Sequence, residues 1–216
     1  MKRRDFSLAA LTAASSALSL TAQAQAPAKK PEEGIDFLAL DKRVPTEVGE
    51  GKIEVIEFFW YSCPHCNAFE PRFAAWLKAA PKDLVVKRVP VRFRDDFEAQ
   101  QRAYYVFEAL NMVDAMHGKL FHAIHTERQS LNTLAALSAW TDKNGIPAAK
   151  FTDTFNSFGV ATKARRATQL QEAFKVQGVP ALGIAGRFYT DGSLTQTMER
   201  ALQVTDYLIG EVRRGR

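Results

Sequence analysis

The sequence predicts an α/β fold in which a mixed central sheet carries an inserted α-helical domain. Two apolar, β-branched runs at 52–60 and 84–91 are typical of central strands that are buried on both faces. The stretch from 95 to 160 has its apolar residues at helical spacing, and two short strands and a helix follow it. This order of elements indicates one sheet whose strands are interrupted by a block of helices.

The first 24 residues have the features of an export signal. Lys2, Arg3 and Arg4 precede an apolar stretch at 8–20 that is too short to span a bilayer, and Ala-Gln-Ala at 22–24 fits a cleavage site. We predict cleavage after Ala24 and exclude residues 1–24 from the fold. An uncleaved interfacial anchor is the alternative, and the paired arginines leave both the Sec and the twin-arginine export routes open.

The composition is that of an ordinary globular protein, with 46% hydrophobic and 25% charged residues. The formal net charge is +5, and it falls to about +3 when residues 1–24 are removed. The basic residues are scattered, apart from a cluster at 213–216, and they form no stripe with interleaved aromatic residues. We therefore expect no nucleic-acid partner.

The N-terminal half begins with a flexible segment at 25–34 and a short edge strand at 36–40. Between the two central strands, residues 64–80 are predicted to be helical, because apolar residues recur at i, i+4, i+7 and i+8. These residues are Phe69, Phe73, Trp76 and Leu77. Pro64 suits the first turn, where a missing N–H costs nothing, whereas Pro71 lies inside the pattern and should kink the helix.

The C-terminal part is predicted to form a long helix at 161–176, a hairpin, and a last helix at 195–212. The first strand of the hairpin, at 178–184, contains a proline, which indicates an edge, a bulge or a special turn. A tight turn at 185–187 joins it to the second strand. The predicted organisation is a sheet domain at 25–94 and 161–216, with the helical domain inserted at 95–160.

Cys63-Pro64-His65-Cys66 lies directly after the first central strand and at the start of the predicted helix, so we expect Cys66 to return near Cys63 after about one turn while Cys63 stays at the exposed tip. The first N–H groups of a helix lack intrahelical partners and, with the helix dipole, favour an anion such as the Cys63 thiolate. A low pKa makes Cys63 a good leaving group and makes the disulfide oxidising, and His65 can add positive charge or a hydrogen bond. The two cysteines close too small a loop to constrain the unfolded chain, which favours a chemical role.

A plain local disulfide and a zinc site are the alternative interpretations of the cysteine pair. Most structural zinc sites need four ligands, and the sequence has no second C-x-x-C. His117, His122 and His125 lie far along the chain, where we expect them to be helix-surface or core residues. We therefore predict no metal site, and no cofactor besides the redox-active Cys63–Cys66 disulfide.

Two motifs resemble one known family. Residues 57–66, which read EFFWYSCPHC, resemble the active-site strand and helix start of the DsbA family of periplasmic thiol:disulfide interchange proteins. Gly178-Val179-Pro180-Ala181 resembles the cis-proline loop of that family. The helical block lies between the two motifs, as the inserted domain of the family does. The resemblance covers nearly all of the mature chain and implies a thioredoxin-like fold, a periplasmic location and the oxidising disulfide for which the family is known.

The resemblance also implies the roles of individual residues. Cys63 is the attacking and attacked sulfur, and Cys66 is the buried resolving one. Pro180 is cis and lies across from the disulfide, and Val179 presents backbone groups to an extended substrate peptide. Glu57 matches the buried acid of the family beneath the active site, where it is placed to relay a proton to or from Cys66.

Glu57 also needs an explanation from the residues alone, because a carboxylate inside so apolar a strand is costly to bury. The alternative is that Glu57 lies at a strand end and reaches water. Lys87, in the second central strand, is the expected partner of Glu57. Pro71 departs from the pattern of the family, which bears on the groove beside the active site and on the substrate range.

Together these observations predict a monomeric periplasmic dithiol oxidase that donates its Cys63–Cys66 disulfide to reduced, newly exported proteins through a Cys63 mixed disulfide. By resemblance, a quinone-linked membrane partner of the DsbB type reoxidises it. The first rival is a reductase or disulfide isomerase on the same fold, although isomerases usually carry an extra dimerisation domain and only a short segment precedes Asp36. The second rival is a metal-binding or chaperone-like module without redox chemistry.

Overall fold

The computed structural model describes residues 29–215, so the predicted signal at 1–24 lies outside the described residues. From Pro31 onward the chain forms one compact unit. Its elements are β1 (Leu38–Ala39), β2 (Ile53–Phe59), α1 (Pro64–Ala79), β3 (Leu84–Pro90), a short 3-10 turn (Asp95–Phe97), α2 (Glu98–Ala109), α3 (Val113–His125), α4 (Leu134–Lys143), α5 (Ala148–Phe155), α6 (Phe158–Ala173), β4 (Ala181–Ile184), β5 (Phe188–Asp191), α7 (Gly192–Thr195) and α8 (Met198–Arg213).

Five strands form one mixed sheet in the order β1-β5-β4-β2-β3, which confirms the predicted α/β class. β2 is parallel to β3, whereas the other neighbouring strands are antiparallel. All seven residues of β2 are buried, as expected of a central strand. The prediction of a second central strand at 84–91 is wrong, because β3 lies at the edge of the sheet. Its apolar run is explained by α2 and α6, which pack against it.

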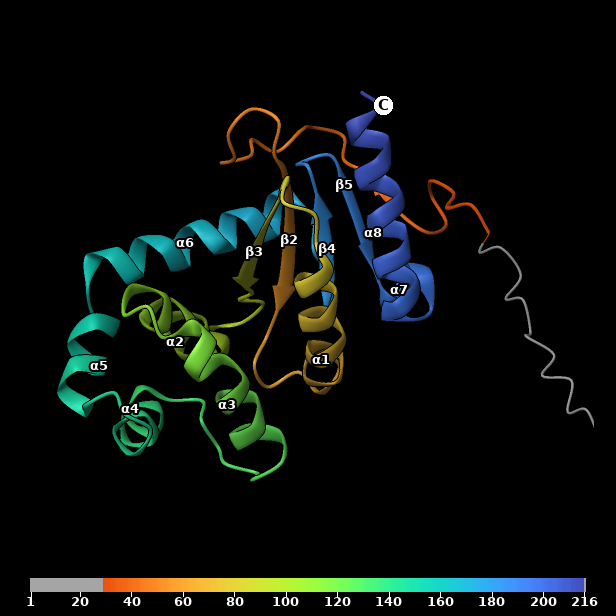
Figure 1. Ribbon diagram of the computed structural model, residues 1–216. Helices are drawn as coiled ribbons and strands as arrows, with labels where there is room; N and C mark the ends of the chain where they lie inside the picture. Colours follow the sequence, from red (N-terminus) through yellow and green to blue (C-terminus); the bar gives the residue numbers. More distant parts are fainter. Residues whose placement is uncertain (1–28, 216) are drawn as a thin grey trace, which may run out of the picture. The chain divides into compact units, whose positions relative to one another are not determined.

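Different helices cover the two faces of the sheet (Figure 1). Val55 and Leu182 face a cluster that α1 and α8 complete. Phe58 points to the opposite face, because side chains alternate along a strand, and its ring lies against that of Phe174, just after α6. Gly183 of β4 makes room for this ring, since a Cβ atom there would lie 2.4 Å from Phe174. The cysteine motif follows β2 directly and is therefore anchored at the centre of the fold.

The predicted block of helices is present as α2 to α5, which Figure 1 shows grouped beside the sheet. The predicted boundary after residue 160 falls in the first turn of α6. This helix starts early because Ser157 caps it, with its hydroxyl oxygen accepting from the Val160 N–H at 3.3 Å. The division into a sheet domain and an inserted domain remains a prediction.

Pro64, Pro71 and Pro180 lie at different kinds of position in the fold. Pro64 occupies the first turn of α1, as predicted, and α1 continues through Pro71 to Ala79. Pro180 lies directly before β4 rather than inside a strand, and the Val179–Pro180 peptide bond is cis, as the resemblance implies. The cis-proline loop thus leads directly into strand β4.

The predicted hairpin and last helix are present with one difference. Ala185 and Gly186 both have positive φ, of 54° and 64°, and together with Arg187 they form the turn between β4 and β5. The last helix, α8, begins at Met198 rather than at 195, because Gln196 has a φ of 65° and cannot be part of a helix, and the short helix α7 precedes it. Thr197 then caps α8 by accepting from the Arg200 N–H.

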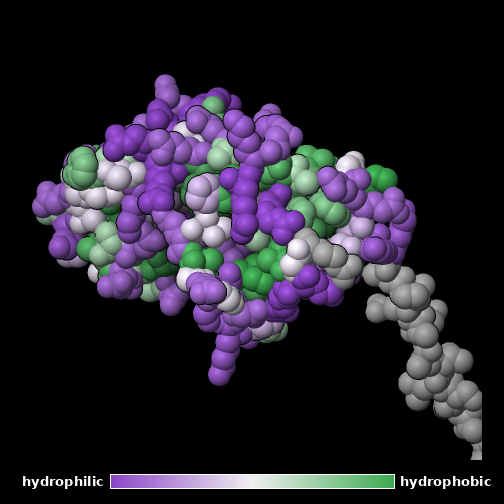
Figure 2. Space-filling view, turned by 90° about the horizontal axis from the view of Figure 1, so that it is seen from above, coloured by the Kyte–Doolittle hydropathy of each residue, from purple (hydrophilic) through white to green (hydrophobic). Residues whose placement is uncertain are grey.

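The surface is mainly polar. Figure 2 shows a face on which hydrophilic side chains surround smaller hydrophobic areas. Four large apolar side chains are exposed within residues 29–215, and these are Ile35, Leu38, Phe93 and Phe158. No helix in that part of the chain has the length and apolar character that spanning a bilayer requires.

Candidate active site

Cys63 is the N-cap of α1, and both cysteines are free thiols in this structure. The Cys63 sulfur accepts a hydrogen bond from the Cys66 N–H at 3.4 Å, and in its protonated form it donates to the Val179 carbonyl oxygen at 3.4 Å. Cys63 is 8% exposed and Cys66 is 1% exposed. The expectation of a Cys63 at an exposed tip is therefore wrong, because the loop with the cis-proline covers it.

The two thiols have pKa values shifted in opposite directions. A hydrogen bond from the Cys66 thiol is the main cause that lowers the pKa of Cys63 to about 6, against the effect of burial. The backbone N–H groups of Cys66 and His65 and the charge of His65 also lower it. Burial raises the pKa of Cys66 well above its usual range, and the neighbouring Cys63 adds to this shift. At neutral pH one sulfur is thus a thiolate and the other a thiol.

Glu57 is 1% exposed, so it does not reach water at a strand end. The prediction that Lys87 is the partner of Glu57 is wrong. Glu57 lies opposite Arg88 in the β2–β3 pairing, and the side chain of Lys87 is on the other face of the sheet. Arg88 Nη1 is 3.3 Å from Glu57 Oε2. Lys87 instead forms an ion pair with Glu54, a second buried carboxylate of β2.

Two carboxylates share the single guanidinium of Arg88. Arg88 Nη2 donates to Glu70 Oε1 of α1 at 2.8 Å, whereas Glu57 Oε2 has no hydrogen-bond partner among the described residues. Burial raises the pKa of Glu57 to about 8, and Arg88 opposes this shift only in part. Burial raises the pKa of Glu70 as well, but hydrogen bonds from His117 and Arg88 and the charge of Arg88 outweigh this effect and lower the pKa below its usual value. The proton therefore resides on Glu57 and the negative charge on Glu70 at neutral pH.

The histidines of the helical block differ in their surroundings. His117 is a core residue, as expected, and its Nδ1 shares a hydrogen bond of 2.9 Å with the hydroxyl of Tyr61. Burial lowers the pKa of His117, so its ring is neutral at neutral pH. His125 is half-buried, and its Nε2 donates to the Tyr61 carbonyl oxygen at 2.8 Å. His122 is exposed and lies near Glu127.

The sequence interpretation missed the residues that surround Glu57. Glu70 had one visible signal, since it lies four residues after Cys66 and hence on the same face of a helix. Arg88 and His117 gave no such signal, because their places depend on strand register and on the packing of α3 against α1.

A groove with a volume of about 500 Å³ lies between the first turns of α1 and the cis-proline loop. His65, Val179 and Pro180, all predicted site residues, line it. Arg72 of α1 and Glu199 of α8 also line it and form an ion pair with each other, a feature that the sequence did not indicate. Pro64 is exposed at the first turn of α1. Together with the cysteines and the residues of the groove, it lies around the N-terminal end of this helix.

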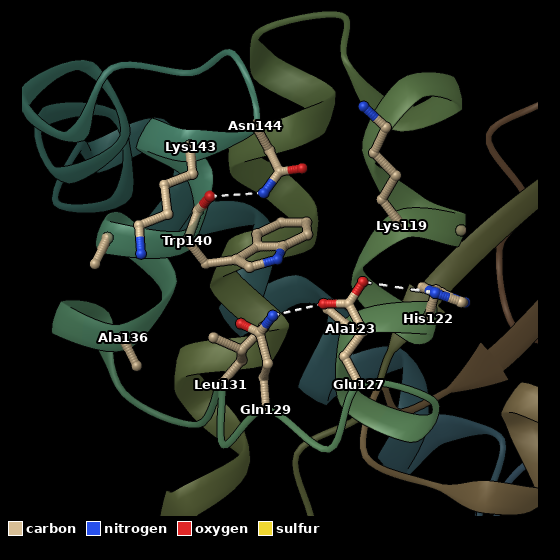
Figure 3. A pocket seen from close by; sticks show the side chains of 12 residues that line it. Lys119, His122, Ala123, Glu127, Gln129, Leu131, Ala136, Trp140, Lys143 and Asn144 are labelled. Atoms are coloured by element: carbon tan, nitrogen blue, oxygen red, sulfur yellow. Dashed lines mark hydrogen bonds and ion pairs between the residues drawn. The ribbon is translucent and has the colours of Figure 1, made fainter.

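A second cavity, of about 590 Å³, lies between α3 and α4 (Figure 3). Leu131, Trp140 and Lys143 are among its lining residues, and none of the predicted site residues lines it. Within residues 29–215, no three His, Cys, Asp or Glu side chains are grouped in a way that would hold a metal ion.

Comparisons with known proteins agree with this geometry. Residues 54–203 match the profile of the DSBA-like thioredoxin domain. The thiol:disulfide interchange protein DsbA of Bordetella parapertussis is 40% identical over 190 residues, which cover 88% of this chain and 90% of the relative. The DsbA of Pseudomonas aeruginosa is 32% identical over 97% of both chains. A crystal structure of the Pseudomonas aeruginosa protein superimposes with a TM-score of 0.80 at 32% identity, covering 84% of this chain and 94% of that one. The chain therefore belongs to the DsbA family of thiol:disulfide oxidoreductases and has its thioredoxin-like fold.

Proposed function

We propose that this protein is a dithiol oxidase that transfers its Cys63–Cys66 disulfide to reduced proteins. The opposite pKa shifts of the two cysteines carry this proposal. A thiolate at Cys63 stabilises the dithiol form of the protein, and a stable dithiol form makes the disulfide a good oxidant. The names of the relatives, which are thiol:disulfide interchange proteins, support the same activity.

The transfer takes place in two exchange steps. A substrate thiolate attacks the Cys63 sulfur, the Cys63–Cys66 bond breaks, and Cys66 leaves and takes up a proton. A second substrate thiolate then attacks the substrate sulfur of the mixed disulfide and releases the Cys63 thiolate. The substrate loses two electrons and gains a disulfide, while the protein ends as the dithiol.

Glu57 supplies the proton that Cys66 needs. Its pKa of about 8 keeps it protonated at neutral pH, and once it has given up its proton its negative charge raises the pKa of Cys66. Arg88 and Glu70 keep the region around Glu57 polar although it is buried. In reoxidation the proton moves back from Cys66 to Glu57.

The substrates proposed are newly exported, reduced proteins in the periplasm, where the protein acts as a monomer. Val179 offers its backbone to an extended segment of the substrate, next to Cys63 and the groove. A quinone-linked membrane protein of the DsbB type restores the disulfide. No cofactor besides the cysteine pair takes part.

Disulfide transfer without oxygen tests this function. The oxidised protein, mixed with a reduced and unfolded protein under anaerobic conditions, should pass on its disulfide stoichiometrically and should be reduced at equilibrium by millimolar glutathione. An equilibrium that leaves the disulfide on this protein would instead identify a reductase.

Two single-cysteine variants check the order of attack. Reduced Cys66→Ala protein, mixed with a disulfide-containing unfolded protein, should form a long-lived mixed disulfide through Cys63, because no second cysteine resolves it. Cys63→Ala protein should form little, because Cys66 is buried and protonated. Equal yields on non-reducing gels would contradict the assigned roles.

A further inference from the structure

We infer that Gln100 and His125 are positioning residues that clamp the Tyr61–Ser62 peptide and thereby place Cys63 at the start of α1. Both side chains come from the block of helices that follows β3, and neither touches a sulfur. This role rests on the proposed part of Cys63 as the reactive thiol.

The contacts reach both ends of one peptide group. His125 of α3 donates from Nε2 to the Tyr61 carbonyl oxygen at 2.8 Å. Gln100 of α2 accepts from the Ser62 N–H with its Oε1 at 3.1 Å. The carbonyl and the N–H belong to the same peptide, so two helices fix its plane from opposite sides. The residue that follows is Cys63, the N-cap of α1.

Gln100 has further bonds that make its position rigid. Its Nε2 donates to the Ser62 hydroxyl oxygen at 2.7 Å and to the Leu131 carbonyl oxygen at 2.9 Å. The side chain is 1% exposed, so losing any of these partners would leave a buried polar group unpaired. Leu131 lies on the wall of the cavity in Figure 3, in the segment between α3 and α4. The amide thus joins α2, this segment and the loop of the active site.

The consequence for Cys63 follows from what lowers its pKa. The Cys66 thiol and the backbone N–H groups at the start of α1 act only over hydrogen-bond distances. A peptide that is free to rotate before the N-cap lets the Cys63 sulfur move away from these donors. Loss of either clamp should therefore destabilise the thiolate.

The neighbouring glutamine offers a matched control. Gln101 is also 1% exposed, and its Nε2 donates to the Pro90 carbonyl oxygen at 3.0 Å and to the Thr168 hydroxyl at 3.3 Å. It lies in the same helix and loses the same kind of bonds on substitution, but its partners are at the end of β3 and in α6. Gln101→Leu should lower stability to a similar extent as Gln100→Leu without altering Cys63.

The experiment measures the pKa of Cys63 in the reduced protein, from the rate of alkylation against pH. Gln100→Leu and His125→Leu should each raise it by about half a unit, a threefold change in the acid dissociation constant. His125→Gln retains a donor and should keep most of the wild-type value. Gln101→Leu should leave the pKa unchanged, and melting curves should show that it is no more stable than Gln100→Leu.

Two outcomes would overturn the inference. One is an unchanged pKa of Cys63 in both clamp variants. The other is an equal shift in Gln101→Leu, which would indicate a general effect of packing. If Gln100→Leu does not fold, the half-buried His125 and its Gln variant decide the question. No substrate is present in this assay, so its result is independent of whether the protein oxidises or reduces its partners.

Discussion

His65 and Cys66 act on the same thiolate with different strength. The hydrogen bond from the Cys66 thiol is the largest cause of the low pKa of Cys63, and the charge of the His65 ring contributes less. His65 is exposed, so water screens its charge, whereas the Cys66 thiol lies in the buried site. His65, the residue between the cysteines that sets this motif apart, therefore lowers the pKa of Cys63 less than Cys66 does.

We expect His65→Ser to raise the pKa of Cys63 by up to about one unit, and Cys66→Ala to raise it by more. For His65→Ser the reduction potential should fall in step, by roughly 30 mV per unit, because only the thiolate form loses stabilisation. Thiolate absorbance in the ultraviolet against pH measures both variants. A larger shift in His65→Ser than in Cys66→Ala would reverse the order of causes argued above.

The parts of the site that are local in sequence were predicted, and those that depend on packing were not. Cys63 at a helix start and Glu57 inside a buried strand follow from neighbouring residues alone. The choice between Lys87 and Arg88 depends on the register of two strands, in which a shift of one residue exchanges the faces. Gln100 and His125 reach the loop from helices that begin far along the chain, and no spacing in the sequence reports that contact.

At the scale of elements, the turn between β4 and β5 holds the segment before β2 against the sheet through one glycine. Gly186 has a φ of 64°, and a Cβ atom there would lie 1.9 Å from the Val44 carbonyl oxygen. The Val44 N–H in turn donates to the Gly186 carbonyl oxygen at 2.7 Å. The turn was predicted from its sequence, but its contact with the segment before β2 was not. The position of β3 could not be predicted for the same reason, because it too depends on tertiary contacts. Helices α2 and α6 cover this edge strand, so its sequence is as apolar as that of a central strand.

We expect Gly186→Ala to destabilise the protein by about 3 kcal/mol or more, from backbone strain and from collision with Val44. Gly51→Ala is the matched control, because Gly51 also has a positive φ, of 74°, but no atom lies within 4 Å of the added Cβ. It should cost about 1 kcal/mol. Urea unfolding of both variants measures the difference, and equal losses would show that the contact with Val44 contributes nothing.

At the scale of the whole molecule, the redox state of two atoms changes the free energy of unfolding. In the dithiol form, Cys63 has a pKa of about 6 when folded and an ordinary, higher value when unfolded. A group whose folded pKa is depressed stabilises the protein above its unfolded pKa and loses this effect as the pH falls through the folded pKa. The disulfide form has no such group. Glu57, with its raised pKa, acts in the opposite direction but is present in both forms.

The difference in stability between the dithiol and disulfide forms should therefore depend on pH. Between about pH 6 and pH 8 the unfolding free energy of the dithiol form should rise by about 2 kcal/mol relative to the disulfide form, and below about pH 5 this contribution should vanish. Cys66 adds nothing in this range, because its raised pKa keeps it protonated in the folded state. Parallel denaturant curves of the two forms at several pH values measure the difference, with Cys63→Ala as the control that has no thiolate. A constant difference across this range would mean that Cys63 is not ionised in the folded dithiol form. The oxidising character proposed for the disulfide would then lack its physical cause, because the same stabilisation of the thiolate drives the transfer of the disulfide to a substrate.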